Sequence, residues 1–236
     1  MTVETFTHIN ALNPALPAVD DPIPEGDDQI RGLKQVLVTD FPNIDSPVTA
    51  TPAQLNGIGM VLLATATVVS ASPAAVVDFA SAITSAYEEY ELHIIDALPV
   101  TSGVAPWVRT STDGGATFAA SSGDYDWMNN RSTGSSATVT NGGTTATKLE
   151  LSIPGVPSVT GTGVCGVIRF YDPGNTTSNK RFDWRISYAG ALPLGNQVTC
   201  VGSGARAAIA DIDAIRFMFS SGSINSGKFK LYGVRK

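Results

Sequence analysis

The chain has 236 residues, a length that favours one or two domains with a hydrophobic core of ordinary size. Its net charge is −6, only 15% of its residues are charged, and it has no basic stripe of the kind that binds nucleic acid. No apolar run reaches the roughly 18 residues of a membrane span, and the N-terminus lacks the basic and apolar regions of a signal peptide. We therefore expect a soluble protein made in a cytoplasm, with no nucleic-acid or membrane partner.

The first 60 residues differ in composition from the rest of the chain. They hold eight acidic residues, two basic residues and half of the 14 prolines, whereas residues 61–236 hold 13 acids and 13 bases. Because proline fixes φ and removes an amide donor, residues 9–26 are not expected to form regular helix or a central strand. This break predicts an extended arm over residues 1–60 and a second domain over residues 61–236.

One short helix is predicted within the arm, over about residues 27–40. Asp27 and Asp28 are expected to cap its N-terminus and to complement its dipole. Its apolar stripe recurs at i, i+3 and i+7 and consists of Ile30, Leu33 and Leu37. Phe41 precedes Pro42 and so avoids the α region, which ends the helix.

A second, shorter turn of helix is predicted to begin at Thr51, with Pro52 at its first helical position. An arm of this kind buries little surface on its own. We therefore interpret residues 1–60 as a docking segment.

From residue 61 onward, apolar residues recur with a period of two, which is typical of half-buried strands. The clearest alternation places four apolar side chains on one face: Phe182, Trp184, Ile186 and Tyr188. Other strands are predicted around Phe217 and Phe229 and over 61–69, 87–96, 105–111, 136–140, 146–152 and 164–171. The pattern of residues 75–86 fits either helix or strand.

Turn signals rich in glycine separate these segments, at Asp113-Gly114-Gly115, Asn141-Gly142-Gly143, Asp172-Pro173-Gly174 and Gly202-Ser203-Gly204. About eight or nine strands are expected. The sequence therefore predicts an all-β fold, an antiparallel β-sandwich with jelly-roll-like topology, preceded by the arm and its helix.

Several unusual short runs occur in order along the arm: Asn13-Pro14, Glu25-Gly26-Asp27-Asp28, Ile30-Arg31, Lys34, Phe41-Pro42-Asn43 and Val48-Thr49-Ala50-Thr51. The C-terminal run IRFMFSSGSINSGKFKLYGVRK carries a second set: Gly222, Ile224, Gly227, Leu231, Tyr232 and Gly233. These two ends resemble those of tail-fibre and other virion proteins of tailed bacteriophages. The first likeness covers about a fifth of the chain.

The resemblance implies a place in a virion assembled in the host cytoplasm, contact with other virion proteins through residues 1–60, and often a homotrimer. Together with the helical pattern, it assigns attachment and trimerisation to Asp27, Asp28, Ile30, Leu33, Leu37 and Phe41.

Residues 111–118 match the S-x-D-x-G-x-T-W/F pattern of the Asp-box found in sialidase propellers. The carboxylate of Asp113 is expected to tie down backbone amides of its own turn, while the glycines supply positive φ. In that family the box is a structural turn remote from catalysis. One copy here predicts a hairpin.

Catalytic residues are not expected, and the protein is predicted not to be an enzyme. His8 lies in the arm, and His93 is interpreted as a half-exposed strand residue; no G-x-S-x-G elbow presents a serine to it. No spacing of acids selects a pair for sugar hydrolysis. Asp124 and Asp126 are interpreted as part of a solvated loop rather than a calcium site.

The two cysteines, Cys165 and Cys200, are expected to be buried free thiols, with a mutual disulfide as the alternative. Their spacing and surroundings do not fit zinc. No metal or cofactor is therefore expected.

A flat aromatic ring can stack on the apolar face of a sugar, so exposed aromatics are candidates for glycan binding. Trp184 is assigned to the core by its alternation, and the other aromatic side chains are mostly expected to fill the core or an interface. The one cluster predicted to bind a ligand is Tyr125, Asp126 and Trp127, which is expected to lie in a loop.

Acids and bases are also separated within the second domain. Residues 78–126 hold eight acids against Arg109, whereas residues 216–236 hold five bases and no acid. Such complementarity stabilises either neighbouring strands of one chain or contacts between subunits.

Two functions are therefore open. The first is an adhesin of the fibre or tip type that binds the host surface, where the ligand would be a polysaccharide. The second is a purely architectural head-fibre, decoration or baseplate protein without receptor binding. A depolymerase is disfavoured by the absence of a convincing acid pair or nucleophile.

Overall fold

The computed structural model describes residues 9, 13, 15, 23–42, 59–134, 136–153, 155–190 and 196–234. The chain divides into two compact units, Met1–Asn56 and Gly57–Lys236. The helical turn predicted at Thr51 lies outside the described residues.

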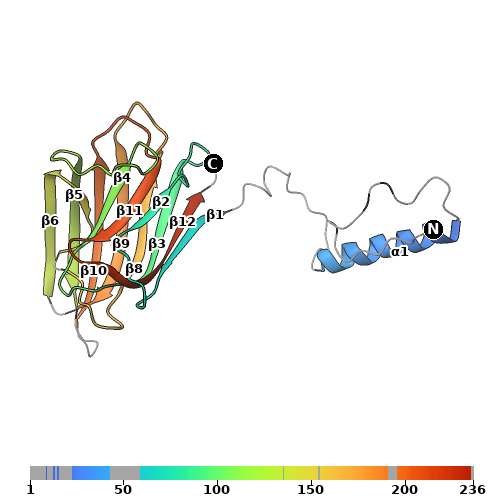
Figure 1. The fold of residues 1–236 in the computed structure, drawn as a ribbon, viewed down its shortest axis with the longest axis horizontal. Helices are drawn as coiled ribbons and strands as arrows, with labels where there is room; N and C mark the ends of the chain where they lie inside the picture. The colour runs from blue at the N-terminus through green and yellow to red at the C-terminus, as the bar shows by residue number, and fades with distance from the viewer. Residues whose placement is uncertain are drawn as a thin grey trace. The chain divides into compact units, whose positions relative to one another are not determined.

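The first unit contains α1 (Ile23–Asp40), the one helix in the part of the chain that the structure describes (Figure 1). It ends before Phe41-Pro42, as predicted, but it begins four residues early. Pro24 fits in the first turn because the first amides of a helix have no intrahelical acceptor. Asp27 and Asp28 are consequently not its cap. Both instead form ion pairs with Arg31, at 2.6 and 2.9 Å.

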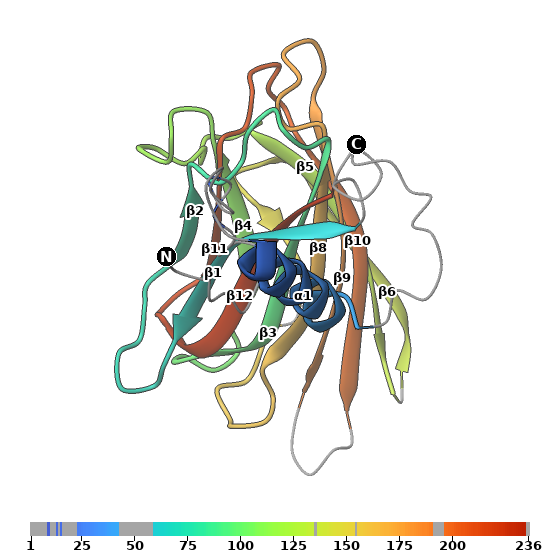
Figure 2. The ribbon, with the colours of Figure 1, turned by 90° about the vertical axis from the view of Figure 1, so that its right-hand side faces the viewer.

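The second unit is an all-β sandwich of two antiparallel sheets. Twelve strands are described: β1 (Met60–Val68), β2 (Val77–Ala80), β3 (Glu89–Pro99), β4 (Pro106–Ser111), β5 (Tyr125–Thr133), β6 (Ser136–Ala146), β7 (Leu149–Glu150), β8 (Val164–Tyr171), β9 (Lys180–Ala189), β10 (Gln197–Arg206), β11 (Ala214–Phe219) and β12 (Ile224–Val234). The large sheet has the order β1-β12-β3-β8-β9-β10-β5-β6, and the small sheet β2-β11-β4-β7. Figure 2 shows the small sheet on one side and β8, β9 and β10 on the other.

The topology is a jelly roll with two insertions. When the hairpins β5–β6 and β9–β10 are set aside, eight strands remain, and they alternate between the sheets along the chain except at β4 and β7, which pair within the small sheet. Numbered in chain order, they lie 1-8-3-6 in the large sheet and 2-7-4-5 in the small one, which is jelly-roll connectivity. The inserted hairpins lie side by side and widen the large sheet.

One continuous core fills the space between the sheets. Phe217 of β11 packs against Phe229 of β12 and against Phe219 of its own strand, and Trp184 of β9 is 1% exposed. The indole of Trp184 donates a hydrogen bond to the carbonyl of Leu151, at 3.0 Å. The assignment of Trp184 to the core is confirmed.

Two of the predicted turns lie inside strands. Gly142 and Gly143 belong to β6, and Gly202 and Gly204 to β10. A Cβ on Gly202 would overlap the ring of Trp184, and one on Gly143 would lie 2.7 Å from the indole nitrogen of Trp127. The prediction of turns there is wrong, because these glycines lie within strands, where they make room for indole rings.

The count of eight or nine strands is wrong for a related reason, since β5 and β10 are absent from it and β6 was predicted only over 136–140. The ambiguous segment 75–86 contains the strand β2. The final strand begins at Ile224, earlier than the alternation around Phe229 indicates.

Candidate functional site

The predicted ligand cluster lies on β5 and not in a loop, so that part of the prediction is wrong. Tyr125 is fully buried, and its hydroxyl accepts a hydrogen bond from the amide of Thr110, at 2.8 Å. Trp127 is 8% exposed, and Gly143 and Gly204 on the neighbouring strands leave room for its side chain. Only Asp126 points outward. The two rings therefore do not form an exposed stacking platform.

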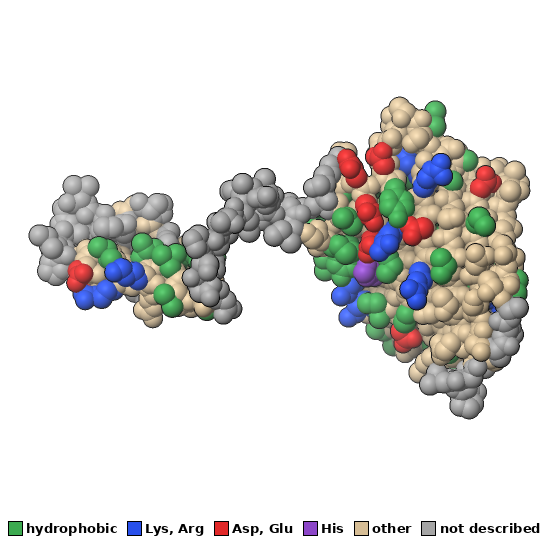
Figure 3. All heavy atoms as spheres, turned by 180° about the vertical axis from the view of Figure 1, so that it is seen from behind, with side chains coloured by type: hydrophobic (Ala, Val, Ile, Leu, Met, Phe, Trp, Pro, Cys, Tyr) green, Lys and Arg blue, Asp and Glu red, His purple; other side chains and the backbone are tan. Residues whose placement is uncertain are grey.

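The outer face of the large sheet is the broadest surface that the sandwich presents. Figure 3 shows charged and hydrophobic side chains gathered on one side of this face, whereas backbone and side chains of other kinds make up most of the rest. The charged side belongs to β12, β3, β8 and β9, and the remainder to β10 and β5.

A polar network joins β3 to β8 on the charged side. Arg169 donates to one carboxylate oxygen of Glu91 at 2.6 Å, and the ring nitrogen Nε2 of His93 lies 2.7 Å from the other. Burial raises the pKa of Glu91, but its hydrogen bonds with His93 and Arg169 outweigh that effect and lower the pKa below the ordinary value. The ring of His93 also packs against Tyr232, with centroids 4.8 Å apart. His93 is thus a partly exposed strand residue.

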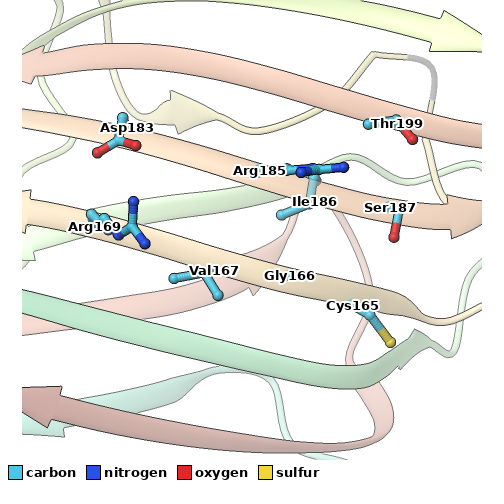
Figure 4. Close-up of a pocket in the computed structure, with 9 residues that line it drawn as sticks. All are labelled: Cys165, Gly166, Val167, Arg169, Asp183, Arg185, Ile186, Ser187 and Thr199. Atoms are coloured by element: carbon cyan, nitrogen blue, oxygen red, sulfur yellow. The ribbon is translucent and has the colours of Figure 1, made fainter. Parts of the chain in front are cut away.

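Beside this network, a hollow of about 490 Å³ opens over β8, β9 and β10 (Figure 4). It is lined by Cys165, Gly166, Val167, Arg169, Asp183, Arg185, Ile186, Ser187 and Thr199. Gly166 has no side chain to fill the hollow, and the position requires glycine because its φ is 155° and a Cβ there would overlap the carbonyl of Arg185. Small side chains at Ser187 and Thr199 leave the space open.

A second hollow, of about 730 Å³, continues along the same face and shares Asp183 with the first. Its floor is β10, whose outward side chains are the small Ser203 and Ala205. Tyr171, 39% exposed, and Met128, 51% exposed, stand at its sides. We call the two hollows together the outer groove.

Within the outer groove, Tyr171 donates a hydrogen bond to the carboxylate of Asp183, at 2.6 Å. Burial and then this hydrogen bond raise the pKa of Tyr171 to about 12, so the ring stays neutral at physiological pH. Asp126 accepts a hydrogen bond from the amide of Thr145, at 2.9 Å. The carboxylates of Asp183 and Asp126 thus both accept hydrogen bonds from within the protein. The groups in the groove that could contact a ligand are hydroxyls, guanidinium groups and one half-exposed aromatic ring.

No signal in the sequence pointed to this groove as a whole. The alternation in β9 places Arg181, Asp183 and Arg185 outward, but only the strand order shows which small residues of β10 lie beside them. Among the described residues, no group of three or more His, Cys, Asp or Glu is gathered as a metal site would need.

The Asp113 turn behaves as its chemistry predicts. The Asp113 carboxylate accepts hydrogen bonds from the hydroxyl of Ser111, at 2.6 Å, and from the hydroxyl and amide of Thr117, at 2.5 and 2.9 Å. These bonds, that from Ser111 first, lower the pKa of Asp113 to about 2. The turn joins β4 in the small sheet to β5 in the large one, so the prediction of a hairpin is wrong.

Both cysteines are free thiols, as expected. Cys200 is buried, and burial raises the pKa of its thiol. Cys165 is exposed at the edge of the outer groove, which corrects the expectation that both are buried.

The residues predicted to attach the arm lie on α1 and just after it. The apolar stripe is exposed: Ile30 55%, Leu33 41%, Leu37 44% and Phe41 48%. Val36, on a different side of the helix, is buried, and the amide of Ile9 donates to the Asp40 carboxylate at 2.7 Å. The helix thus has one buried side and one apolar side that the described residues leave open.

Comparisons with models of known families, with curated proteins and with solved structures find no match. None of the described helices has the length and apolar character that crossing a membrane requires.

Proposed function

We propose that this chain is a structural protein of a bacteriophage virion, of the fibre or tip type. Residues 1–60 attach it to the particle, and the β-sandwich binds the host surface, where its ligand is a polysaccharide. The open stripe of α1, in a unit separate from the sandwich, supports the attachment role. Association into a homotrimer would cover that stripe.

The observation that carries the binding role is the outer groove. It is long, open and lined with hydroxyls from Ser187, Thr199 and Ser203, with arginines and with the half-exposed Tyr171. Hydroxyl groups donate and accept hydrogen bonds and guanidinium groups donate them, so both match sugar hydroxyls, and one apolar ring face suits stacking.

The experiment is to locate the protein on the particle by negative-stain imaging with an antibody raised against the sandwich. Label at the distal end of a fibre or at the tail tip is expected. Label spread over the capsid would contradict the receptor-binding role.

One observation favours the second candidate, a purely architectural protein. Burial of Tyr125 and Trp127 removes the aromatic pair that a glycan-binding surface was predicted to use. Capsid label in the same images, together with loss of capsid stability when the protein is deleted, would select that function.

A further inference from the structure

The outer groove contains charged side chains of both signs. Three arginines line it, Arg169, Arg181 and Arg185, against the carboxylates of Asp126 and Asp183. The charge of Arg169 is already balanced by ion pairs, since its guanidinium lies 2.6 Å from the carboxylate of Glu91 and 3.7 Å from that of Glu89. The two groove arginines without an ion-pair partner among the described residues, Arg181 and Arg185, are therefore both on β9.

Arg181 and Arg185 have no such partner. Both are exposed, and no carboxylate of the described residues lies within ion-pair distance of either. Asp183 lies between them on β9. It is the cross-strand neighbour of Arg169, and its carboxylate accepts a hydrogen bond from the hydroxyl of Tyr171. Figure 4 shows Arg169 and Asp183 side by side and Arg185 apart from both.

Arg181 and Arg185 are placed so that both could contact one elongated ligand, at two separate positions. Four residues along a strand put them on the same face, roughly 13 Å apart. Ser187 and Thr199 lie beside Arg185, and Ser203 and Ala205 form the floor towards Arg181. Guanidinium groups bind carboxylates in bidentate fashion, and hydroxyls match hydroxyls.

We propose that the outer groove binds an acidic polysaccharide, with Arg181 and Arg185 each contacting one of its acid groups. This rests on the proposed function and names its ligand class. A single-stranded nucleic acid shares the negative charge, but it is bound through several stacking rings and a basic track. The groove offers one half-exposed ring, Tyr171, and two free cations.

The test measures binding of the full-length protein to immobilised polysaccharides by biolayer interferometry. The acidic probes are polygalacturonate, alginate and hyaluronate, and the neutral probes are dextran and galactomannan. A single-stranded oligonucleotide is the third probe. The variant is Arg181→Gln with Arg185→Gln. The matched control is Lys228→Gln with Lys230→Gln, which removes the same charge from β12 on the same face, outside the groove.

We expect at least one acidic probe to bind, more weakly as salt rises, and the arginine variant to bind it about tenfold less than the control. Circular dichroism checks that both variants fold. Equal loss in both variants would overturn the proposal in favour of non-specific attraction, and stronger oligonucleotide binding would overturn it in favour of nucleic acid. Binding to neutral probes alone would overturn the acidic ligand and leave the proposed function standing. Binding to no probe would count against both.

Discussion

At the scale of single residues, the large sheet is shaped by contacts between indole rings and glycines on the neighbouring strands. Trp127 packs beside Gly143 and Gly204, and Trp184 beside Gly202. Each ring fills the space that a side chain on the neighbouring strand would otherwise take. Buried aromatic rings of this size are tolerated in a tightly paired sheet only where such space exists.

Replacing Gly202 with alanine should therefore destabilise the sandwich by about 1–3 kcal/mol, the usual cost of overpacking a core. The new methyl group overlaps the ring of Trp184, whose hydrogen bond to Leu151 holds it in place. Urea unfolding followed by tryptophan fluorescence measures the change.

Gly174→Ala is the control, because a Cβ there would meet nothing closer than 3.7 Å. Its effect should stay within about 0.5 kcal/mol. Equal stability of the two variants would contradict the packing account.

Glu91 makes the sandwich sensitive to acid. Its pKa in the folded protein lies below the ordinary value of 4.5, so its contribution to stability is complete above that value and is lost as the pH falls through the folded pKa. Glu91→Gln should thus unfold at lower urea than the wild type at pH 7, and the difference should shrink as the pH falls below 4.5. Urea midpoints across this range test it. Midpoints that stay a constant distance apart at every pH would show that Glu91 does not contribute in this way.

At the scale of elements, α1 presents an apolar side with no described neighbour. Changing Leu33 and Leu37 to serine should weaken self-association, because burying each leucine contributes about 1.5–3 kcal/mol. The melting temperature of the sandwich should not change, since its core is separate. Light scattering and calorimetry measure the two effects.

The control is Lys34→Ser with Gln35→Ser, which alters exposed polar positions on the same helix. It should leave association intact. A wild-type protein that is monomeric at micromolar concentration would contradict the trimer itself.

Alternation predicted the strands that have one face in the core and one in solvent. β9 is the clearest, since its buried residues are those that the period of two selects. β5 and β10 were missed because their asparagines, serines and glycines are typical of turns, and what holds them in the sheet is packing against tryptophans that are distant in sequence. The helix start was missed because proline was taken as a breaker at a position where no amide donor is needed.

The outer groove was not predictable, for a related reason. A sequence shows that Arg181 and Arg185 point the same way, but the hollow depends on Gly166, Ser203 and Ala205 on two other strands. Strand order decides this, and it arises from the inserted hairpins. The predicted aromatic cluster failed because alternation through β5 places Tyr125 and Trp127 inward.

At the scale of the whole molecule, the chain joins two units with different physical characters. The sandwich has its own core and paired strands, and we expect it to fold alone. The arm is acidic and proline-rich, and its helix leaves an apolar side open. Segments that bury little of their own surface gain order from a partner. Limited proteolysis of purified protein should accordingly remove residues 1–60 before it cuts the sandwich.

The same division predicts where attachment resides. Particles assembled with a 61–236 truncation should lack the protein, whereas residues 1–60 fused to an unrelated folded domain should still be incorporated. Immunoblots of purified particles measure both, and a fusion carrying Leu33→Ser and Leu37→Ser tests whether the stripe of α1 makes the contact. Because the truncated chain keeps the core of the sandwich, its absence from particles would reflect the missing arm and not a failure to fold, which circular dichroism of the truncated protein checks. Normal incorporation of the truncated chain would instead place the attachment surface on the sandwich, and the outer groove would then be a candidate for that contact.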